Sequence, residues 1–188
     1  MRNLIAATNE ALARRGVPLS GDPKRSLPRI NRDVRFSKDK SPYKAYVSAT
    51  FMREPCEMSP GRIYLQLSPG ECFAGAGFFM LERDNLAAMR AAIVARADDW
   101  LGIKARLEAA GHPVGGEDSF RRMPRGFEAQ ADAATADALR WRGHTCKMML
   151  APGAAQAPDL PKRIADFAAR SLPLLQFGWD ALRIGPEN

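Results

Sequence analysis

The sequence contains few of the residues on which most catalytic and metal centres depend. Of its 188 residues, only three are cysteine and two are histidine. Cys56, Cys72 and Cys146 are odd in number and widely spaced, which argues against a disulfide framework and against a zinc knuckle. His112 and His144 have cationic or glycine neighbours rather than a matched acid and nucleophile. We therefore expect both histidines to be structural or surface residues, and we predict neither a metal site nor a cofactor.

Long apolar runs and nucleotide-binding motifs are also missing. The longest apolar stretch, 72–81, is broken by glycine and is far too short to span a bilayer. The amphipathic stretch 1–16 lacks the apolar core of a signal peptide, so we expect a cytoplasmic protein that does not contact membranes. The Gly-Ala-Gly of residues 75–77 lacks the third glycine of the dinucleotide fingerprint, and no Gly-Lys-Ser/Thr motif occurs.

The composition is otherwise that of a globular protein with a net positive charge. Hydrophobic residues make up 46% of the chain and charged residues 26%. This length predicts a single domain over 1–188. The net charge of +7 permits contact with phosphates or nucleic acid.

Nearly all of this positive charge lies in one stretch. Residues 24–44 contain eight Lys or Arg and two Asp, a net charge of +6. Ile30, Val34 and Phe36 fall on one side of an alternating pattern, turn-forming residues occupy 37–42, and a second alternating run begins at Tyr43. Arg32 points toward the apolar side and must therefore be paired or line a cleft. The pattern predicts a β-hairpin with a cationic loop.

Two interpretations of this basic stretch remain open. In the first, its side chains converge on a phosphate or carboxylate, for which arginine offers bidentate geometry. The candidate anion-binding residues are Arg29, Arg32, Arg35, Lys38, Lys40, Tyr43 and Lys44. In the second, Asp33 and Asp39 pair with neighbouring cations, and the remaining charges are solvated on an edge strand.

Outside the basic stretch, the sequence predicts a helix at the N-terminus, then strands, and then mostly helices. Strands are expected over 43–51, 62–68 and 71–80, after the first hairpin strand, and 144–150 is expected to be a short strand or an extended connector. Helices are predicted over 3–15, 86–97, 100–110, 132–142 and 160–175. The residues expected to cap or stop them are Asp84, Asp98, Asp159 and, as a kink or end, Pro173. The fold class is therefore α+β, an antiparallel β-meander of about four strands packed against helices from both ends of the chain.

A second cationic cluster lies in the loop 112–125. It consists of Arg121, Arg122 and Arg125. It would lie against the first cluster if the fold brings this loop over the sheet; otherwise it is a solvated loop.

Three segments resemble an uncharacterised family of bacterial and fungal conserved hypothetical proteins, a domain of unknown function. They are RINRDVRFSKDKSPYK (29–44), RIYLQLSPGECFAGAGFFM (62–80) and RRMPRGFEAQADAATADALRWRG (121–143). The resemblance covers most of 27–143 and implies a fold but no activity. Two departures stand out: the chain lacks the family's longer helical N-terminal region with an Asn-Arg-Glu-Trp-Phe-like stretch, and 128–131 replaces a turn containing Pro-His. A site built from either feature would be incomplete here.

Three functions are compatible with the basic hairpin. The leading hypothesis is that it binds a small anionic, phosphorylated ligand, as a binding module or as an enzyme, with Tyr43 or Tyr46 stacked on a ring of the ligand. The alternative is a nucleic-acid-binding domain that contacts phosphates. In the third, the hairpin contacts an acidic protein partner.

Overall fold

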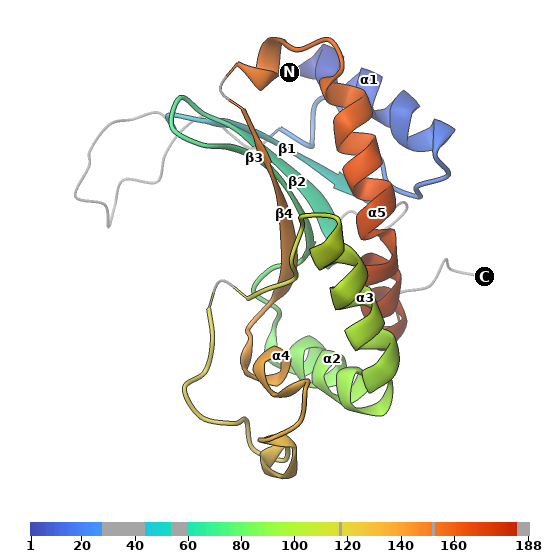
Figure 1. Cartoon of the computed structure of the whole chain (residues 1–188). Coiled ribbons are helices and arrows are strands. Elements are labelled where there is room, and N and C mark those ends of the chain that lie inside the picture. The colour runs from blue at the N-terminus through green and yellow to red at the C-terminus, as the bar shows by residue number, and fades with distance from the viewer. Residues whose placement is uncertain (28–43, 54–59, 117, 152, 184–188) are drawn as a thin grey trace.

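The computed structural model describes residues 1–27, 44–53, 60–116, 118–151 and 153–183. Over these residues the chain forms one four-stranded sheet and five α-helices, which confirms the predicted α+β class (Figure 1). The strands are β1 (Val47–Met52), β2 (Arg62–Leu67), β3 (Cys72–Phe78) and β4 (His144–Leu150).

The sheet is antiparallel throughout, in the order β1-β2-β3-β4. The first three strands form the expected meander. Strand β4 follows only after three α-helices and pairs with β3. In this pairing, His144 lies opposite Phe78. The stretch 144–150 is therefore a strand and not a connector. The hairpin strand predicted over 28–36 lies outside the described residues.

Three of the helices begin and end within about three residues of the predicted positions. The helix predicted over 132–142 spans only five residues, because 132–135 form turns, and the last helix is longer than predicted. The α-helices are α1 (Arg2–Arg14), α2 (Arg83–Ala95), α3 (Ala97–Ala109), α4 (Ala136–Arg140) and α5 (Leu160–Ala181), with short 3₁₀ turns η1 (Glu128–Gln130) and η2 (Ala154–Gln156). Asp84 and Asp98 lie in the first turns of α2 and α3 rather than at the N-caps. In the first turn, their carboxylates still interact favourably with the helix dipole. Asp159 is the N-cap residue of α5, without a side-chain cap hydrogen bond.

Of the two expectations for Pro173, a kink or an end of the last helix, the end is wrong. Helix α5 continues through this proline to Ala181. A proline inside a helix costs about 3 kcal/mol. Burial of the following turns offsets this cost, because Leu174, Leu175 and Trp179 are almost completely removed from solvent.

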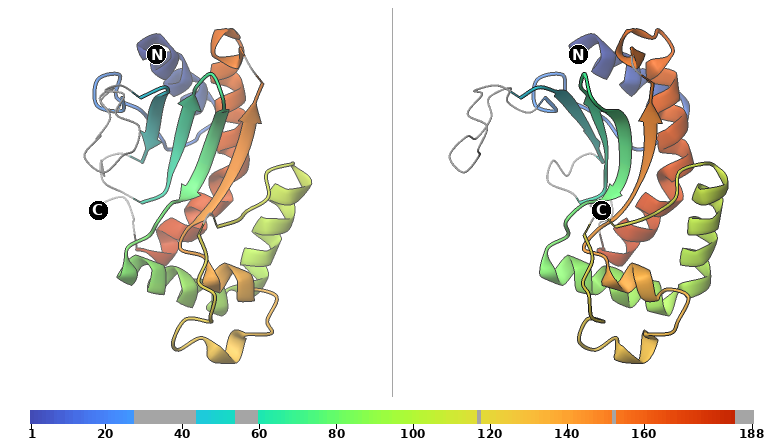
Figure 2. Two further views of the ribbon diagram at one scale, coloured as in Figure 1. Left: turned by 90° about the vertical axis from the view of Figure 1, so that its left-hand side faces the viewer. Right: turned by 60° about the vertical axis from the view of Figure 1, so that its left-hand side comes forward.

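All of the long helices lie on one side of the sheet. Helix α5 runs across this side against β3, α1 packs on α5 from the outside, and α2 and α3 cover the end of the sheet where β4 begins (Figures 1 and 2). In the left panel of Figure 2, no described helix covers the opposite face of the sheet. The fold therefore has a covered face, which forms the core, and an open face.

A close contact between the layers is at Phe78, whose ring is fully buried where β3 meets α5. A Cβ atom at Gly178 of α5 would overlap this ring. A Cβ atom at Gly61 would lie 2.6 Å from Phe78 Cε1 and 2.7 Å from Trp179 Nε1. Both positions therefore require glycine for the helix to reach the sheet.

We predict that alanine substitutions at two glycines of β3 change the stability of the protein by very different amounts. Gly77 has a φ of 127°, and a Cβ atom there would collide with the carbonyl oxygen of His144 and lie 2.9 Å from Thr145 Cα. Gly77→Ala should lower the free energy of unfolding by about 3 kcal/mol or more. Gly75→Ala is the matched control, because its nearest neighbour would be Phe73 Cε2 at 3.6 Å. It should change stability by less than about 0.5 kcal/mol. Urea unfolding of both variants measures the difference, and equal losses would contradict the assigned backbone at Gly77.

Candidate functional site

The strand register defines which side chains lie on the open face. Residues on the covered side, such as Ala49, Leu65 and Ala76, are buried, and their neighbours in sequence point the other way. The open face carries Ser48, Thr50 and Met52 on β1, Arg62, Tyr64 and Gln66 on β2, Phe73, Gly75 and Gly77 on β3, and Thr145, Lys147 and Met149 on β4. None of the four strands contains an aspartate or glutamate. The strands themselves therefore place no carboxylate beside the cations of this face.

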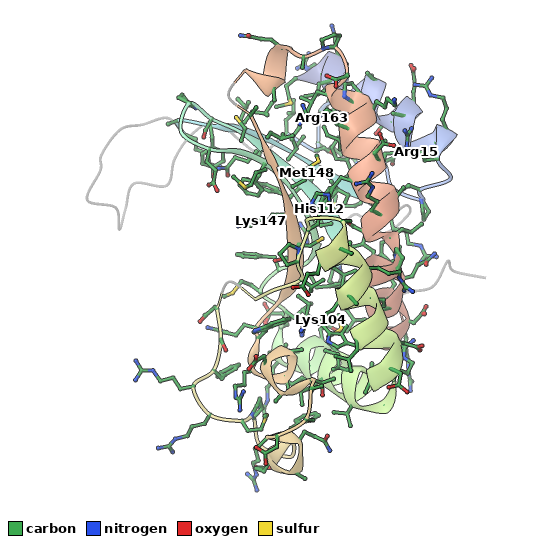
Figure 3. All side chains as sticks on the ribbon, viewed as in Figure 1. Arg15, Lys104, His112, Lys147, Met148 and Arg163 are labelled. Carbon is green, nitrogen blue, oxygen red and sulfur yellow. The ribbon has the colours of Figure 1, made fainter. Side chains whose placement is uncertain are left out.

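An aromatic pair and a lysine form the centre of the open face. The rings of Tyr64 and Phe73 lie 5.9 Å apart at 47°, and Lys147 Nζ lies over the Phe73 ring at 4.9 Å. The Tyr64 hydroxyl donates a hydrogen bond of 3.3 Å to Gln66 Oε1. Figure 3 shows Lys147 on the open side of β4. These contacts hold an aromatic surface and an ammonium group in fixed positions next to each other.

Gly75 lies in the middle of this cluster, beneath the Phe73 ring, whose Cε2 would be 3.6 Å from a Cβ atom on this glycine. It pairs with Tyr64 on one side and with Lys147 on the other. These two side chains are thus two strand spacings apart, roughly 10 Å. In the next row, Arg62 lies opposite Gly77 and is exposed, without an ion pair to a described residue. We refer to Arg62, Tyr64, Phe73 and Lys147 as the open-face cluster.

The thiol and imidazole groups of the described residues do not join this cluster. Cys146 lies on the covered side, where burial raises the pKa of its thiol to about 11 despite a contact with the Ser171 hydroxyl. The Cys72 thiol donates to the Ser68 carbonyl oxygen. His112 packs edge-on against Phe167. The open face thus offers cationic and aromatic groups suited to binding, without a nucleophile activated by a base.

His144 is a structural residue, as the sequence predicts. It is completely buried, and the rings of Trp100 and Trp141 lie 5.3 and 5.8 Å from its own. Its Nε2 lies 2.9 Å from the Ala138 carbonyl oxygen, so Nε2 must carry the hydrogen and donate it. The pKa of His144 is lowered to about 4, chiefly by burial and to a smaller extent by the positive charge of Arg90, although the hydrogen bond to Ala138 opposes the shift.

Most of the residues proposed from the basic stretch lie outside the described residues. These are Arg29, Arg32, Arg35, Lys38, Lys40 and Tyr43. Lys44 is described and is half-buried, with its Nζ 5.7 Å from the centre of the Tyr46 ring. The described ends of the stretch are both attached at β1, because Thr50 N–H donates to the Ser26 carbonyl oxygen and Lys44 precedes the strand by three residues.

The second cationic cluster is at the far end of the molecule. Arg121, Arg122 and Arg125 are exposed on the loop beside α4, beyond the end of the sheet at which β4 begins (Figures 1 and 2). The loop does not lie over the open face. These three arginines and the open-face cluster therefore belong to separate surfaces.

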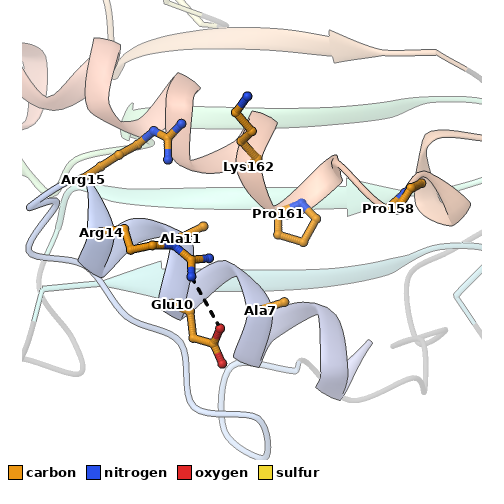
Figure 4. Close-up of a pocket in the computed structure, with 8 residues that line it drawn as sticks. All are labelled: Ala7, Glu10, Ala11, Arg14, Arg15, Pro158, Pro161 and Lys162. Carbon is orange, nitrogen blue, oxygen red and sulfur yellow. Dashed lines mark ion pairs between the residues drawn. The ribbon is translucent and has the colours of Figure 1, made fainter.

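Two grooves lie on the helical side of the molecule. A groove of about 410 Å³ runs between α1 and the start of α5 (Figure 4). Its cations are already paired in part, Arg14 with Glu10 at 4.0 Å and Arg15 with Asp166. A second groove of about 310 Å³ lies beside Arg96, which pairs with Asp180 at 3.8 Å. We interpret both as ordinary gaps between helices, because carboxylates compensate their charges.

The described residues contain neither a candidate metal site nor a helix that could span a membrane. Within the ranges above, no three His, Cys, Asp or Glu side chains come together in a way that could hold a metal ion. No described helix is both long enough and apolar enough to cross a bilayer.

A comparison with protein families identifies the chain. Residues 1–177 match the model of a conserved hypothetical protein family, DUF2461. The chain belongs to the DUF2461 family. The resemblance in the sequence to an uncharacterised family is thereby confirmed. No curated protein and no solved structure matches the chain.

Sequence reasoning about this DUF2461 protein missed the open-face cluster. Arg62 and Tyr64 follow from the alternation of β2, once Ile63 and Leu65 are assigned to the core. Phe73 and Lys147 cannot be added in the same way, because their juxtaposition depends on the pairing of β3 with β4, which are 65 residues apart in the sequence.

We predict that His144 makes stability depend on pH. Between a pH of about 6.5, the ordinary pKa of histidine, and about 4, the unfolded chain binds a proton on this residue that the folded protein does not bind. Acidification through this window should therefore remove up to about 3 kcal/mol of stability.

Denaturant unfolding at several pH values, compared between the wild type and His144→Gln, isolates this contribution. Glutamine retains an N–H donor for the Ala138 carbonyl and does not titrate. The advantage of the wild type over the variant should shrink as the pH falls from 7 to 4. Parallel stability curves would contradict the prediction.

Proposed function

We propose that this protein binds a small phosphorylated ligand that carries a flat ring, at the open-face cluster. The observation that carries the proposal is the combination of the Tyr64 and Phe73 rings with Lys147 and Arg62 on the open face of the sheet. The proposal assigns binding and not a reaction.

The charge pattern favours an anionic ligand. Lys147 and Arg62 lie on either side of the β3 glycines, so an anion above this strand would meet positive charge from two directions. Residues 24–44, with their net charge of +6, are attached through Ser26 at the edge formed by β1.

The aromatic pair favours a ligand with a ring. The Tyr64 ring is half-buried, and the Phe73 ring, which is only 9% exposed, lies beside it over Gly75. The exposed part of Tyr64 is therefore the surface on which a ring of the ligand would stack. The distance of roughly 10 Å between Tyr64 and Lys147 suits a group the size of a nucleobase or sugar with an attached phosphate. Nucleotides meet both requirements, whereas inorganic phosphate meets only one.

Single-stranded nucleic acid is a second candidate, supported by the same geometry. Proteins that bind single strands combine stacking aromatic residues with a positively charged surface that follows the backbone. The open-face cluster supplies two aromatic residues and two cations. Because strand binding releases counterions, its affinity should fall steeply as salt rises, unlike that of a mononucleotide.

The first experiment is a thermal-unfolding screen in low salt with nucleoside mono- and diphosphates, sugar phosphates, inorganic phosphate and oligothymidylates. A ligand present at a hundred times its Kd should add about 2.7 kcal/mol of stability and raise Tm by several degrees. We expect nucleotides to give a larger shift than sugar phosphates at equal concentration.

Variants then locate the site. Lys147→Gln and Tyr64→Leu should each weaken binding by about tenfold or more, measured by isothermal titration calorimetry. Lys162→Gln, an exposed lysine on α5, is the matched control and should bind as the wild type does. If the Lys147 and Lys162 variants bind equally well, or if no ligand shifts Tm, the proposal fails. A shift with oligothymidylates alone, which salt removes, would favour nucleic acid.

A further inference from the structure

The end of the sheet next to α4 exposes apolar side chains between three extended segments. Leu81 N–H donates to the Arg142 carbonyl oxygen at 3.0 Å, and Arg142 N–H donates to the Asp118 carbonyl oxygen at 3.0 Å. Phe120 N–H donates to the Arg140 carbonyl oxygen at 2.8 Å. The segments 79–81, 140–143 and 118–120 thus lie side by side. Phe79, Met80 and Phe120 on the outer two segments are 63%, 44% and 43% exposed.

Phe120 is held in place although it is exposed. The guanidinium carbons of Arg90 and Arg142 lie 5.3 and 5.7 Å from the centre of its ring. Arg90 is itself buried and fixed by donation to the carbonyl oxygen of Leu139 at 2.7 Å, and Arg142 is fixed by Asp118 at 3.0 Å. An exposed aromatic ring held in this way loses little conformational entropy when a partner covers it.

The loop that follows Phe120 is attached to the core by two of its side chains and exposes three arginines. Met123 and Phe127 are partly buried against the core, on either side of Pro124. Arg121, Arg122 and Arg125, by contrast, are exposed, and none of the three forms an ion pair with a described residue. Three arginines and an aromatic residue are thus displayed together on one ordered loop.

We propose that this surface, formed by Phe120 with Arg121, Arg122 and Arg125, docks an acidic polypeptide segment of a partner protein. Carboxylates of the segment would pair with the arginines, and an apolar side chain would cover Phe120. Arginine and aromatic residues are the types that supply most of the binding energy at protein interfaces. The surface is separate from the open-face cluster, so the two proposals stand or fall independently.

The local charge balance favours a polypeptide over nucleic acid. Residues 118–142 contain five arginines but also four acidic residues: Asp118, Glu128, Asp132 and Asp137. Two of these carboxylates already neutralise Arg142 and Arg140 at 3.0 Å. The net charge of this stretch is only +1 (five minus four), which suits a short segment with a few acidic residues better than a polyanionic backbone, whose affinity depends on many phosphate contacts.

A peptide-display selection tests this proposal even though the partner is unidentified. Random 12-residue peptides are selected on the immobilised wild-type protein and counter-selected on the Arg121→Gln, Arg122→Gln double variant. These side chains are exposed, so the double variant should keep the wild-type Tm. We expect enriched peptides to carry several Asp or Glu residues next to an aromatic or aliphatic residue.

The best peptide is then measured by fluorescence anisotropy. The double variant and Phe120→Ala should each weaken its binding at least tenfold, whereas Lys147→Gln on the open face should leave it unchanged. The proposal is overturned if no peptide depends on the two arginines or if the dependent peptides lack acidic residues. It is also overturned if an oligothymidylate binds this loop more tightly than the best peptide does.

Discussion

The arrangement of the layers depends on one close contact, between the ring of Phe78 and the backbone of Gly178. Helix α5 can lie directly on β3 only because no side chain separates the two at this point. Gly61 allows Trp179 to approach the same ring, and the Trp179 indole donates to the Pro60 carbonyl oxygen at 3.2 Å. The contact ties the last helix to the strand β3 and to the start of β2. Helices α1, α2 and α3 in turn contact α5, on the same side of the sheet.

This one-sided packing determines which strand residues are available for binding. Residues that alternate toward α5 are committed to the core, and they include His144 and Cys146, the most chemically distinctive side chains of β4. Burial suppresses the charge of both groups, since it lowers the pKa of the imidazole and raises that of the thiol. The opposite side keeps Tyr64, Phe73 and Lys147, and no described helix covers them.

Local sequence patterns predicted most elements because each depends on neighbouring residues. The alternation around Ile63 and Leu65 fixes β2, and the apolar stripe of α5 is visible from its own residues, whatever they pack against. Errors arose where distant parts of the chain decide. The packing of Trp179 extends α5 past Pro173, and the pairing of β4 with β3 creates a site that no local pattern contains. The basic stretch, by contrast, was recognised by charge alone, and its anion-binding role remains a prediction.

The two proposed surfaces differ in how they depend on electrostatics. Residues 24–44 hold +6 of the net charge of +7, so the rest of the chain is nearly neutral overall. At physiological salt the Debye length is about 8 Å, and charges beyond that distance act weakly on a surface. The loop of Arg121 to Arg125 lies at the far end of the sheet and must therefore rely on its own arginines and on Phe120. The open face has the ends of the charged stretch at its β1 edge, so long-range attraction should speed the arrival of anions there. Under the two proposals, specificity at the arginine loop would therefore rest on short-range contacts, whereas at the open face charge would attract the ligand and the aromatic pair would select it.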